Sequence, residues 1–565
     1  MLSATPLQQP PNDDKVADTD SSHSHVTITM QPLQDSLSLD NKIIARFLED
    51  IQQSGIKAQE VDGRTPPREA LMHDRGAVIP RLVVSPQSES EVSRTLMLLK
   101  RHGLYRNLPV SVKSGGHGYF NGASCAGIMI NLASMTSRRI QGNTMFLEPG
   151  CALGQVLSTL REHRKAVPHG DGFGVGAGGH FLTAGWDLIL SRRYGLGCQS
   201  VVGGRIVLWD GSTVEVNENS HPQLLYAMRG GAVAEAGVVT EIRLRLIDEP
   251  SCVVWRFAPI TKEQLEMCVA QNAFSNAVAL PNDISLSFRF HFEQDQPEPV
   301  CSFNIVSLLS ADETIHCLNQ YLGKEVTSFL GAPGTWSNKG LLDLRMEPAS
   351  ELLAAEPEIL ADISTSAFHE NPLAYWNQTS SLQEMARSYF TSISHWIVPE
   401  CEAMLLDLYE AFQDVRQQPL RTRMFAYILL GGGRMLEMQE SCAMPLGGAL
   451  ARFELHWDNP ETESQWCRRF TDRISRTIQS KADLGPGRPY RGDIWLAEQA
   501  KDNRLDAILR DYDRRDVLAE STLHKKRSAW TTNYLRVNKA ENAILMKIKQ
   551  LCSWQTVRQR LKFQR

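Results

Sequence analysis

The sequence predicts an α+β protein with at least two domains. The chain has 565 residues, more than one ordinary hydrophobic core organises. Up to about residue 250, short apolar strands alternate with amphipathic helices. Beyond residue 250, longer strands of alternating apolar and polar residues are followed by helices. This second pattern is typical of an antiparallel sheet with helices.

The first half carries a clear helix signal between two predicted strands. Ser88 and Glu91 form a capping box, and Gly103 follows the last turn of the helix that they begin. We expect strands at 80–84 and 109–113 on either side of this helix. Further strands are expected at 127–132, 201–208 and 237–247, and a further helix carries Val156, Leu157 and Leu160 on one face.

In the second half, alternation of period two predicts strands. The segment 284–292 alternates phenylalanines and aliphatic residues with polar ones, and 424–430 and 450–457 are further strands. Arg452, Glu454 and His456 share one face of the last of these. Helices are expected after the capping pairs Thr261 with Gln264 and Ser310 with Glu313.

Composition narrows the function classes. A net charge of −5 with 22% charged residues shows no basic excess, so we expect no nucleic-acid partner. No apolar run approaches the roughly 18 residues of a membrane span, and no metal-ligand spacing occurs. Residues 1–40 are polar, without a signal-peptide core, and are expected to form a disordered leader. Eleven cysteines without a C-x-x-C pair favour free thiols and a cytoplasmic location. Nothing indicates the oligomeric state.

The strand at 109–113 leads into a glycine-rich turn, Ser114-Gly115-Gly116-His117-Gly118. Glycines allow positive φ and a close approach of the backbone to a ligand. Consecutive amide groups in such a turn form an anion-binding concavity. A neutral imidazole adds little to anion binding, so His117 requires another explanation.

A second glycine cluster occupies residues 170–180. Gly174, Gly176 and Gly179 match G-x-G-x-x-G, which suggests a nicotinamide-dependent dehydrogenase as one alternative. That motif requires a strand immediately before it and an acid about 20 residues later. Val167-Pro168-His169-Gly170 is no strand, and Asp210 lies too far along the chain. The context therefore disfavours this alternative.

Four motifs in order carry a resemblance to a known family. They are Lys113-Ser114-Gly115-Gly116-His117, Gly176-Ala177-Gly178-Gly179-His180, Ser191-Arg192-Arg193-Tyr194-Gly195-Leu196 and Met228-Arg229-Gly230-Gly231. Together they resemble the berberine bridge enzyme-like FAD-linked oxidases of the vanillyl-alcohol oxidase superfamily. The resemblance implies a two-part PCMH-type FAD-binding domain over residues 76–250, an antiparallel substrate domain over 251–490, and a C-terminal segment, 491–565, that returns to the FAD domain.

The resemblance also implies the cofactor site. His117 matches the histidine that bonds covalently to the flavin, and Gly172 stands where many relatives have a second, cysteinyl tether. Val175 matches the position where a small residue admits oxygen to the flavin. The implied FAD-contacting residues are Ser114, Gly115, Gly116, His117 and Gly118, then Gly170, Gly172, Val175, Gly176, Gly178, Gly179 and His180, and finally Gly237 and Val239.

Glu454 resembles the strand glutamate that acts as catalytic base in the family. Arg452 and His456 are expected to tune its pKa or to hold substrate. A solvent-exposed strand face is the alternative, and Tyr534 is suggested as a catalytic residue only by its position. The expected reaction is two-electron oxidation of a small organic molecule with O₂ as acceptor, including cyclisation or desaturation in secondary-metabolite biosynthesis. A flavin-binding protein without turnover is the remaining alternative.

Overall fold

The structure is a computed structural model that describes residues 31–117, 123–170, 172–345, 388–444, 446–481 and 503–512. The chain divides into two units, Met1–Arg46 and Phe47–Arg565. Helix α1 (Gln31–Gln53) begins in the first unit. Residues 31–40 of the expected disordered leader are therefore helical, which corrects that part of the expectation. The rest of the leader lies outside the described residues.

Two sheets form from residues 57–245. The first has the order β1-β2-β4-β3, in which β2, β4 and β3 are parallel and β1 is antiparallel. The second is antiparallel, with the order β5-β6-β10-β8-β9. Their strands are β1 Lys57–Glu60, β2 Leu82–Ser85, β3 Val110–Lys113, β4 Ile128–Asn131, β5 Arg138–Gln141, β6 Thr144–Leu147, β8 Val201–Leu208, β9 Thr213–Val216 and β10 Gly237–Arg245.

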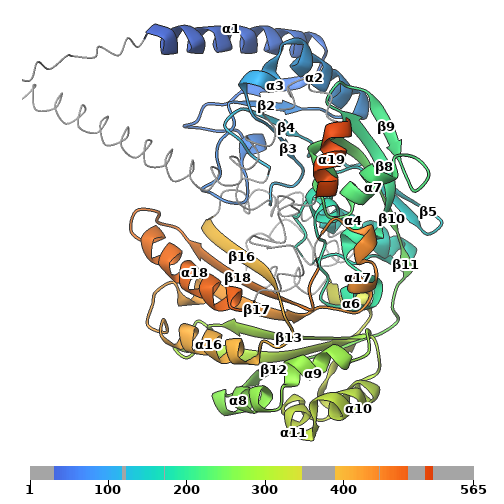
Figure 1. The fold of residues 1–565 in the computed structure, drawn as a ribbon, viewed down its shortest axis with the longest axis vertical. Helices are drawn as coiled ribbons and strands as arrows, with labels where there is room; N and C mark the ends of the chain where they lie inside the picture. The colour runs from blue at the N-terminus through green and yellow to red at the C-terminus, as the bar shows by residue number, and fades with distance from the viewer. Residues whose placement is uncertain are drawn as a thin grey trace, which may run out of the picture. The chain divides into compact units, whose positions relative to one another are not determined.

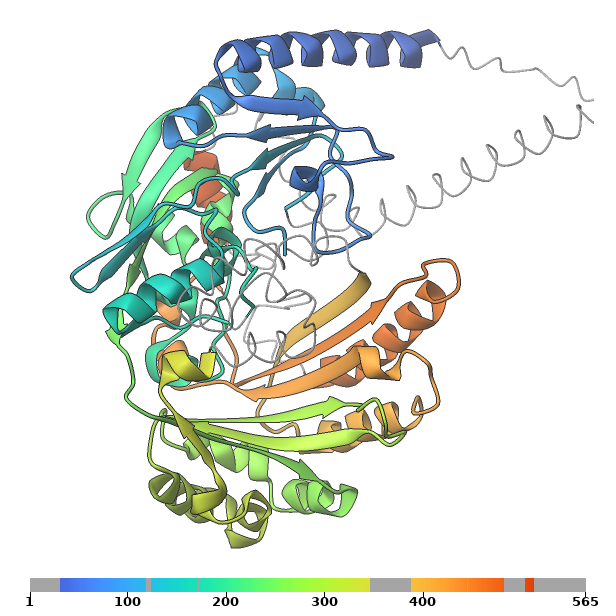
Figure 2. The ribbon, with the colours of Figure 1, turned by 180° about the vertical axis from the view of Figure 1, so that it is seen from behind.

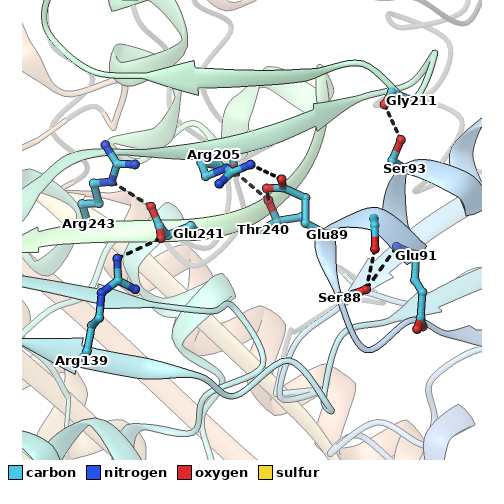
Figure 3. Close-up of polar contacts among 11 residues, drawn as sticks. Ser88, Glu89, Glu91, Ser93, Arg139, Arg205, Gly211, Thr240, Glu241 and Arg243 are labelled. Carbon is cyan, nitrogen blue, oxygen red and sulfur yellow. Dashed lines mark hydrogen bonds and ion pairs between the residues drawn. The ribbon is translucent and has the colours of Figure 1, made fainter.

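Helix α2 (Glu89–Arg101) joins the antiparallel sheet through polar contacts (Figure 3). The carboxylate of Glu89 accepts hydrogen bonds from Arg205 on β8 and from Thr240 Oγ1 on β10, the latter at 2.7 Å. Ser93 Oγ donates to the carbonyl of Gly211 at 2.5 Å. One half of the predicted capping box is confirmed, because Ser88 Oγ accepts the backbone N–H of Glu91 at 3.3 Å, whereas the Glu91 carboxylate accepts the N–H of Gln87 instead of that of Ser88. The helix is thus fixed at its first turns.

A third, seven-stranded antiparallel sheet follows residue 250. Its order is β15-β12-β14-β13-β17-β18-β16. Helices α8–α11, α16 and α18 contribute to the hydrophobic cluster on one of its faces, and Figures 1 and 2 show α16 and α18 against the strands. The strands are β12 Val253–Ile260, β13 Ile284–His291, β14 Val300–Ser307, β15 Ser337–Lys339, β16 Tyr389–Ile397, β17 Met424–Leu430 and β18 Ala449–Trp457. The predicted α+β class with an antiparallel second sheet is confirmed.

The remaining elements are helices and one small strand pair. The pair is β7 (Lys165–Ala166) with β11 (Ile247–Asp248). The helices are α3 Leu104–Asn107, α4 Leu153–His163, α5 Ala177–Leu182, α6 Ser191–Tyr194, α7 Pro222–Met228, α8 Lys262–Ala270, α9 Ala273–Asn276, α10 Ala311–Leu322, α11 Lys324–Thr327, α16 Glu402–Gln413, α17 Arg434–Glu437, α18 Ser464–Gln479 and α19 Asn503–Tyr512. Leu505 and Ile508 of α19 belong to the hydrophobic cluster of the five-stranded sheet.

Both faces of the seven-stranded sheet are covered by protein. One face carries Phe288, Phe453 and the other core residues that pack on the helices. The opposite face, called here the inner face, carries Glu454. On it, Trp396 and Leu450 pack with Trp186, which follows the second glycine loop. Glu454 on the inner face is therefore buried, while Arg452 and His456 beside it stay partly exposed, whereas a two-period sequence pattern is typical of a sheet with one face in water.

Candidate active site

The first glycine loop begins where the parallel strand β3 ends. Gly116 has φ of +79°, which a residue with a side chain adopts only with strain. Ser114 Oγ donates to the carbonyl of Pro149, and the N–H of His73 donates to the carbonyl of Gly116 at 2.8 Å. The turn is therefore held from two sides, and His117 follows directly.

The second glycine loop packs backbone to backbone against the first. A Cβ at Gly176 would collide with the backbone nitrogen of Gly115 and with Ser114 Oγ. A Cβ at Gly115 would in turn collide with the backbone of Gly176. Gly178 N–H donates to the carbonyl of Pro149 at 3.0 Å, so the same carbonyl ties both loops together. The glycines are required because two main chains meet here.

We expect Gly176→Ala to reduce the flavin content of the purified protein at least about tenfold. The added methyl group would push the two loops apart, and a clash with backbone costs 1–3 kcal/mol or more. Gly334→Ala is the matched control, because nothing lies within 4 Å of a Cβ there and Gly334 belongs to neither glycine loop. The measurement is the ratio of flavin to protein absorbance. Equal flavin content in both variants would show that the close approach does not matter.

Most of the predicted FAD-contacting residues lie in these two loops, but some are buried supports. His180 is buried on α5, and its Nε2 accepts the N–H of Gly170 at 3.2 Å. Burial, with a smaller effect from Arg345, lowers the pKa of His180 to about 3, so its imidazole is neutral. Val239 packs in the hydrophobic core, and Gly237 lies where a Cβ would meet the backbone of β8. Gly118 and Tyr534 lie outside the described residues.

A row of aromatic rings links the first glycine loop to the inner face. His117 stacks on His73 with ring centroids 4.8 Å apart, and His73 meets Phe390 of β16 edge-on at 5.4 Å. Phe390 in turn stacks on His456 of β18 at 5.4 Å. His456 Nε2 lies 2.8 Å from Glu454 Oε1. The structure thus brings together the predicted flavin-attachment residue and the predicted base, which are far apart in the sequence.

Glu454 is a buried carboxylate held by two cationic or polar partners. It is 8% exposed, which excludes the alternative of a solvent-exposed strand face. Its carboxylate pairs with the guanidinium of Arg452 and with His456. Burial by itself raises the pKa of Glu454, but the Arg452 charge and the His456 hydrogen bond outweigh it and lower the pKa to about 2. The group is therefore ionised at every physiological pH.

Sequence reasoning missed the residues that position the ring row. His73 and Phe390 stand in no recognisable motif. The segment before His73 is anchored by Lys113, whose buried ammonium group donates to the carbonyls of Glu69 and Leu71, both at 2.8 Å. Burial lowers the pKa of Lys113 to about 8. In the sequence, the lysine at the end of a short strand, directly before the glycine turn, was the one feature that could have indicated this anchoring contact.

A second buried polar cluster supports the chain after the second loop. Asp187 pairs with Arg345, and both side chains are at most 2% exposed. Arg345 Nη1 also lies 2.6 Å from His169 Nε2, and the backbone N–H of His169 donates to Asp187 Oδ2 at 2.9 Å. Burial, followed by the Arg345 charge, lowers the pKa of His169 far below its usual value. This cluster is a structural support for the loop.

Other predicted features concern metals, thiols and membranes. In the part of the chain that the structure describes, no cluster of His, Cys, Asp or Glu could hold a metal ion. The ten cysteines there are all free, and Cys198 Sγ lies 3.7 Å from Cys442 Sγ without a bond. None of the described helices is long and apolar enough to span a membrane.

The described residues thus place two packed glycine loops near a sheet that carries a buried carboxylate. Residues 80–217 match the family model for the FAD binding domain. FAD-dependent monooxygenase sdcF of Emericella nidulans is 39% identical over 134 residues, 23% of this chain and 28% of that protein. Tetrahydroberberine oxidase of Berberis wilsoniae is 30% identical over 193 residues, 33% of this chain and 35% of that protein. The chain thus spans about a third of the length of the curated relatives it matches.

Solved structures extend the likeness in fold to most of the chain. BBE-like 1 of Physcomitrella patens matches with a TM-score of 0.63 and 17% identity, covering 84% of this chain and 97% of that one. Glucooligosaccharide oxidase from Acremonium strictum, described with a 6-S-cysteinyl, 8α-N1-histidyl FAD, matches with a TM-score of 0.65 and 17% identity, covering 83% and 97%. Residues 80–217 are thus similar to the FAD binding domain of FAD-linked oxidoreductases, and the described chain has the fold of the solved BBE-like structures.

Proposed function

We propose that the chain is an FAD-dependent oxidase that removes two electrons from a small organic molecule, in reactions such as cyclisation or desaturation of a secondary metabolite, and passes them to O₂. The ring row from His117 to His456 carries this proposal. It joins the residue that would attach the flavin to the buried carboxylate that would take up a proton. A reaction centre requires both groups within reach of one substrate.

The residues of the cradle fit a flavin dinucleotide. Close backbone packing of Gly115 on Gly176 and the positive φ of Gly116 fix the turn of the first loop, and the anion-binding concavity expected of such a turn would suit a pyrophosphate. His117 would form a single covalent bond to the cofactor. When bound, the flavin supplies hydride acceptance from the substrate and electron transfer to O₂.

The polar residues of β18 would handle the proton. The ionised carboxylate of Glu454 can accept a proton from the substrate. Arg452 and His456 hold its two oxygens in place, so the acceptor does not have to be oriented during the reaction. A carboxylate with a pKa of about 2 is a weak base, so substrate binding must loosen one of these two contacts before proton transfer.

A solved structure of similar fold supports a covalent flavin, and Gly172 favours a single tether in this chain. The glucooligosaccharide oxidase of similar fold carries both a cysteinyl and a histidyl bond to its FAD. In this chain, a Cβ at Gly172 would stand 2.9 Å from Val175 Cγ2, so a cysteine there would require Val175 to move. The two curated relatives are described as a monooxygenase and an oxidase, and both descriptions fit electron transfer to O₂.

The decisive experiment is acid precipitation of the purified protein. We expect the yellow flavin spectrum to stay with the denatured pellet, and to move to the supernatant in the His117→Ala variant. Dithionite-reduced wild type should recover its oxidised spectrum when air is admitted. A colourless protein would refute the proposed function, whereas flavin released from the wild-type pellet would refute only the covalent bond.

A further inference from the structure

The inner face carries a second arginine, Arg289, two strands away from the strand that carries Arg452 and Glu454. Arg289 on β13 is in register with Tyr427 on β17, and Tyr427 is in register with Arg452 on β18. Side chains directly across a sheet point to the same face. Arg289 therefore faces the same interior region as Arg452 and its partner Glu454.

The two arginines differ in how their charge is compensated. Arg452 pairs with Glu454. Arg289 forms no ion pair with any described residue, and its Nε is buried without a hydrogen-bond partner. Its guanidinium lies 5.5 Å from the ring centroid of Tyr427. Arg289 is partly exposed, but its buried Nε has lost water without gaining a hydrogen-bond partner, and such a group is costly until a ligand pairs with it.

The surroundings of Arg289 supply polar atoms but no negative charge. Burial, followed by the Arg289 charge, lowers the pKa of His291 to about 4, so this neighbour is neutral. His291 Nδ1 and Asn304 Oδ1 are also buried without partners among the described residues. Ser302 on β14 lies directly opposite Arg289 and adds a hydroxyl group. These groups match a polar ligand with one negative charge.

The distance between the strand of Arg289 and the strand of Glu454 limits the size of that ligand. Two strand spacings separate β13 from β18, which corresponds to about 10 Å. Between them lie the rings of Phe425 and Tyr427, whose centroids are 5.3 Å apart. An aromatic body would contact these rings, while an acid group would reach Arg289.

We propose that the substrate is a small aromatic carboxylic acid, whose carboxylate binds Arg289 while its oxidisable carbon lies near Glu454. This inference rests on the proposed function for the reaction, but the anion site can be tested without turnover. Arg289 would be a binding residue that sets the orientation of the substrate. The guanidinium fork suits a carboxylate with two parallel hydrogen bonds.

Calorimetric titration of the flavin-loaded full chain with cinnamate and with its neutral amide tests the inference. We expect the wild type to bind the acid at least about tenfold more tightly than the amide. Arg289→Gln should reduce this ratio to about one, and Arg289→Lys should keep an intermediate ratio. Arg473→Gln, which removes an arginine from helix α18 on the other face of the sheet, should leave the ratio unchanged.

Equal affinity for acid and amide in the wild type, or no measurable binding of the acid, would overturn the inference. So would an unchanged ratio in Arg289→Gln. If Arg289→Gln loses its flavin or unfolds, Arg289→Lys is the variant that tests the anion site. Lysine keeps the positive charge but lacks the guanidinium fork, so an unchanged acid-to-amide ratio in this variant would overturn the inference. A yellow, oxygen-reactive protein that binds the acid and the amide equally well refutes the anion site alone. A colourless protein that discriminates through Arg289 refutes the oxidase function alone.

Discussion

Glu454→Gln is expected to slow substrate oxidation by about 10²–10⁴-fold while the flavin stays bound. Glutamine keeps the shape of the side chain but cannot accept a proton, and it removes the charge that pairs with Arg452. The measurement is the anaerobic rate at which the best-reacting small molecule bleaches the flavin. Because the pKa of Glu454 is held at about 2 before substrate binds, protonation of the free protein should not limit kcat/KM until the pH falls towards that value.

A matched surface variant separates this effect from a general loss of charge. Glu437→Gln changes a half-exposed glutamate that pairs with Arg434 within helix α17. It should leave the rate and the flavin content as in the wild type. Full turnover in Glu454→Gln would remove Glu454 as the base. Loss of flavin from that variant would instead indicate a structural role for the carboxylate.

Arg192→Met is expected to lower the free energy of unfolding by about 3–5 kcal/mol. The fully buried guanidinium group donates to the carbonyls of Leu280 and Ile284, each within 2.9 Å, and to that of Gly431. Methionine fills a similar volume but leaves three buried carbonyls without a donor. The measurement is urea unfolding followed by tryptophan fluorescence.

The neighbouring residue is the control for Arg192. The side chain of Arg193 is 50% exposed and forms an ion pair with Asp283 at 3.3 Å. Arg193→Met should therefore change the unfolding free energy by less than about 1 kcal/mol. Similar losses in both variants would mean that the motif Ser191–Leu196 is stabilised by its charge and not by the three buried hydrogen bonds.

Local signals in the sequence were sufficient for most elements. The three predicted helix caps form as expected, since Thr261 and Ser310 accept the N–H of the residue three positions on, as Ser88 does. Strands β8 and β17 have the predicted bounds. Helix capping and strand alternation depend on residues only a few positions apart, so both can be predicted from the local sequence.

Some backbone conformations could not be predicted from the residue types. Residues Ala232–Glu235 all have positive φ, although none of them is glycine. Left-handed backbone costs about 1–2 kcal/mol for each such residue, so surrounding contacts must impose it. Trp209 Nε1 donates to the carbonyl of Glu235 at 2.6 Å and is one such contact.

By itself, the sequence determined the α+β class and the two glycine loops, and the resemblance to a known family added His117 and Glu454 as groups to test. The tertiary structure alone decided how these groups meet. His73 and Phe390 connect them only because β16 pairs with β18 and because the N–H of His73 donates to Gly116. On the inner face, the contacts with Arg452 and His456 keep the buried Glu454 ionised, and Arg289 forms no ion pair with a described residue. Contacts between residues hundreds of positions apart depend on packing, which no local pattern encodes.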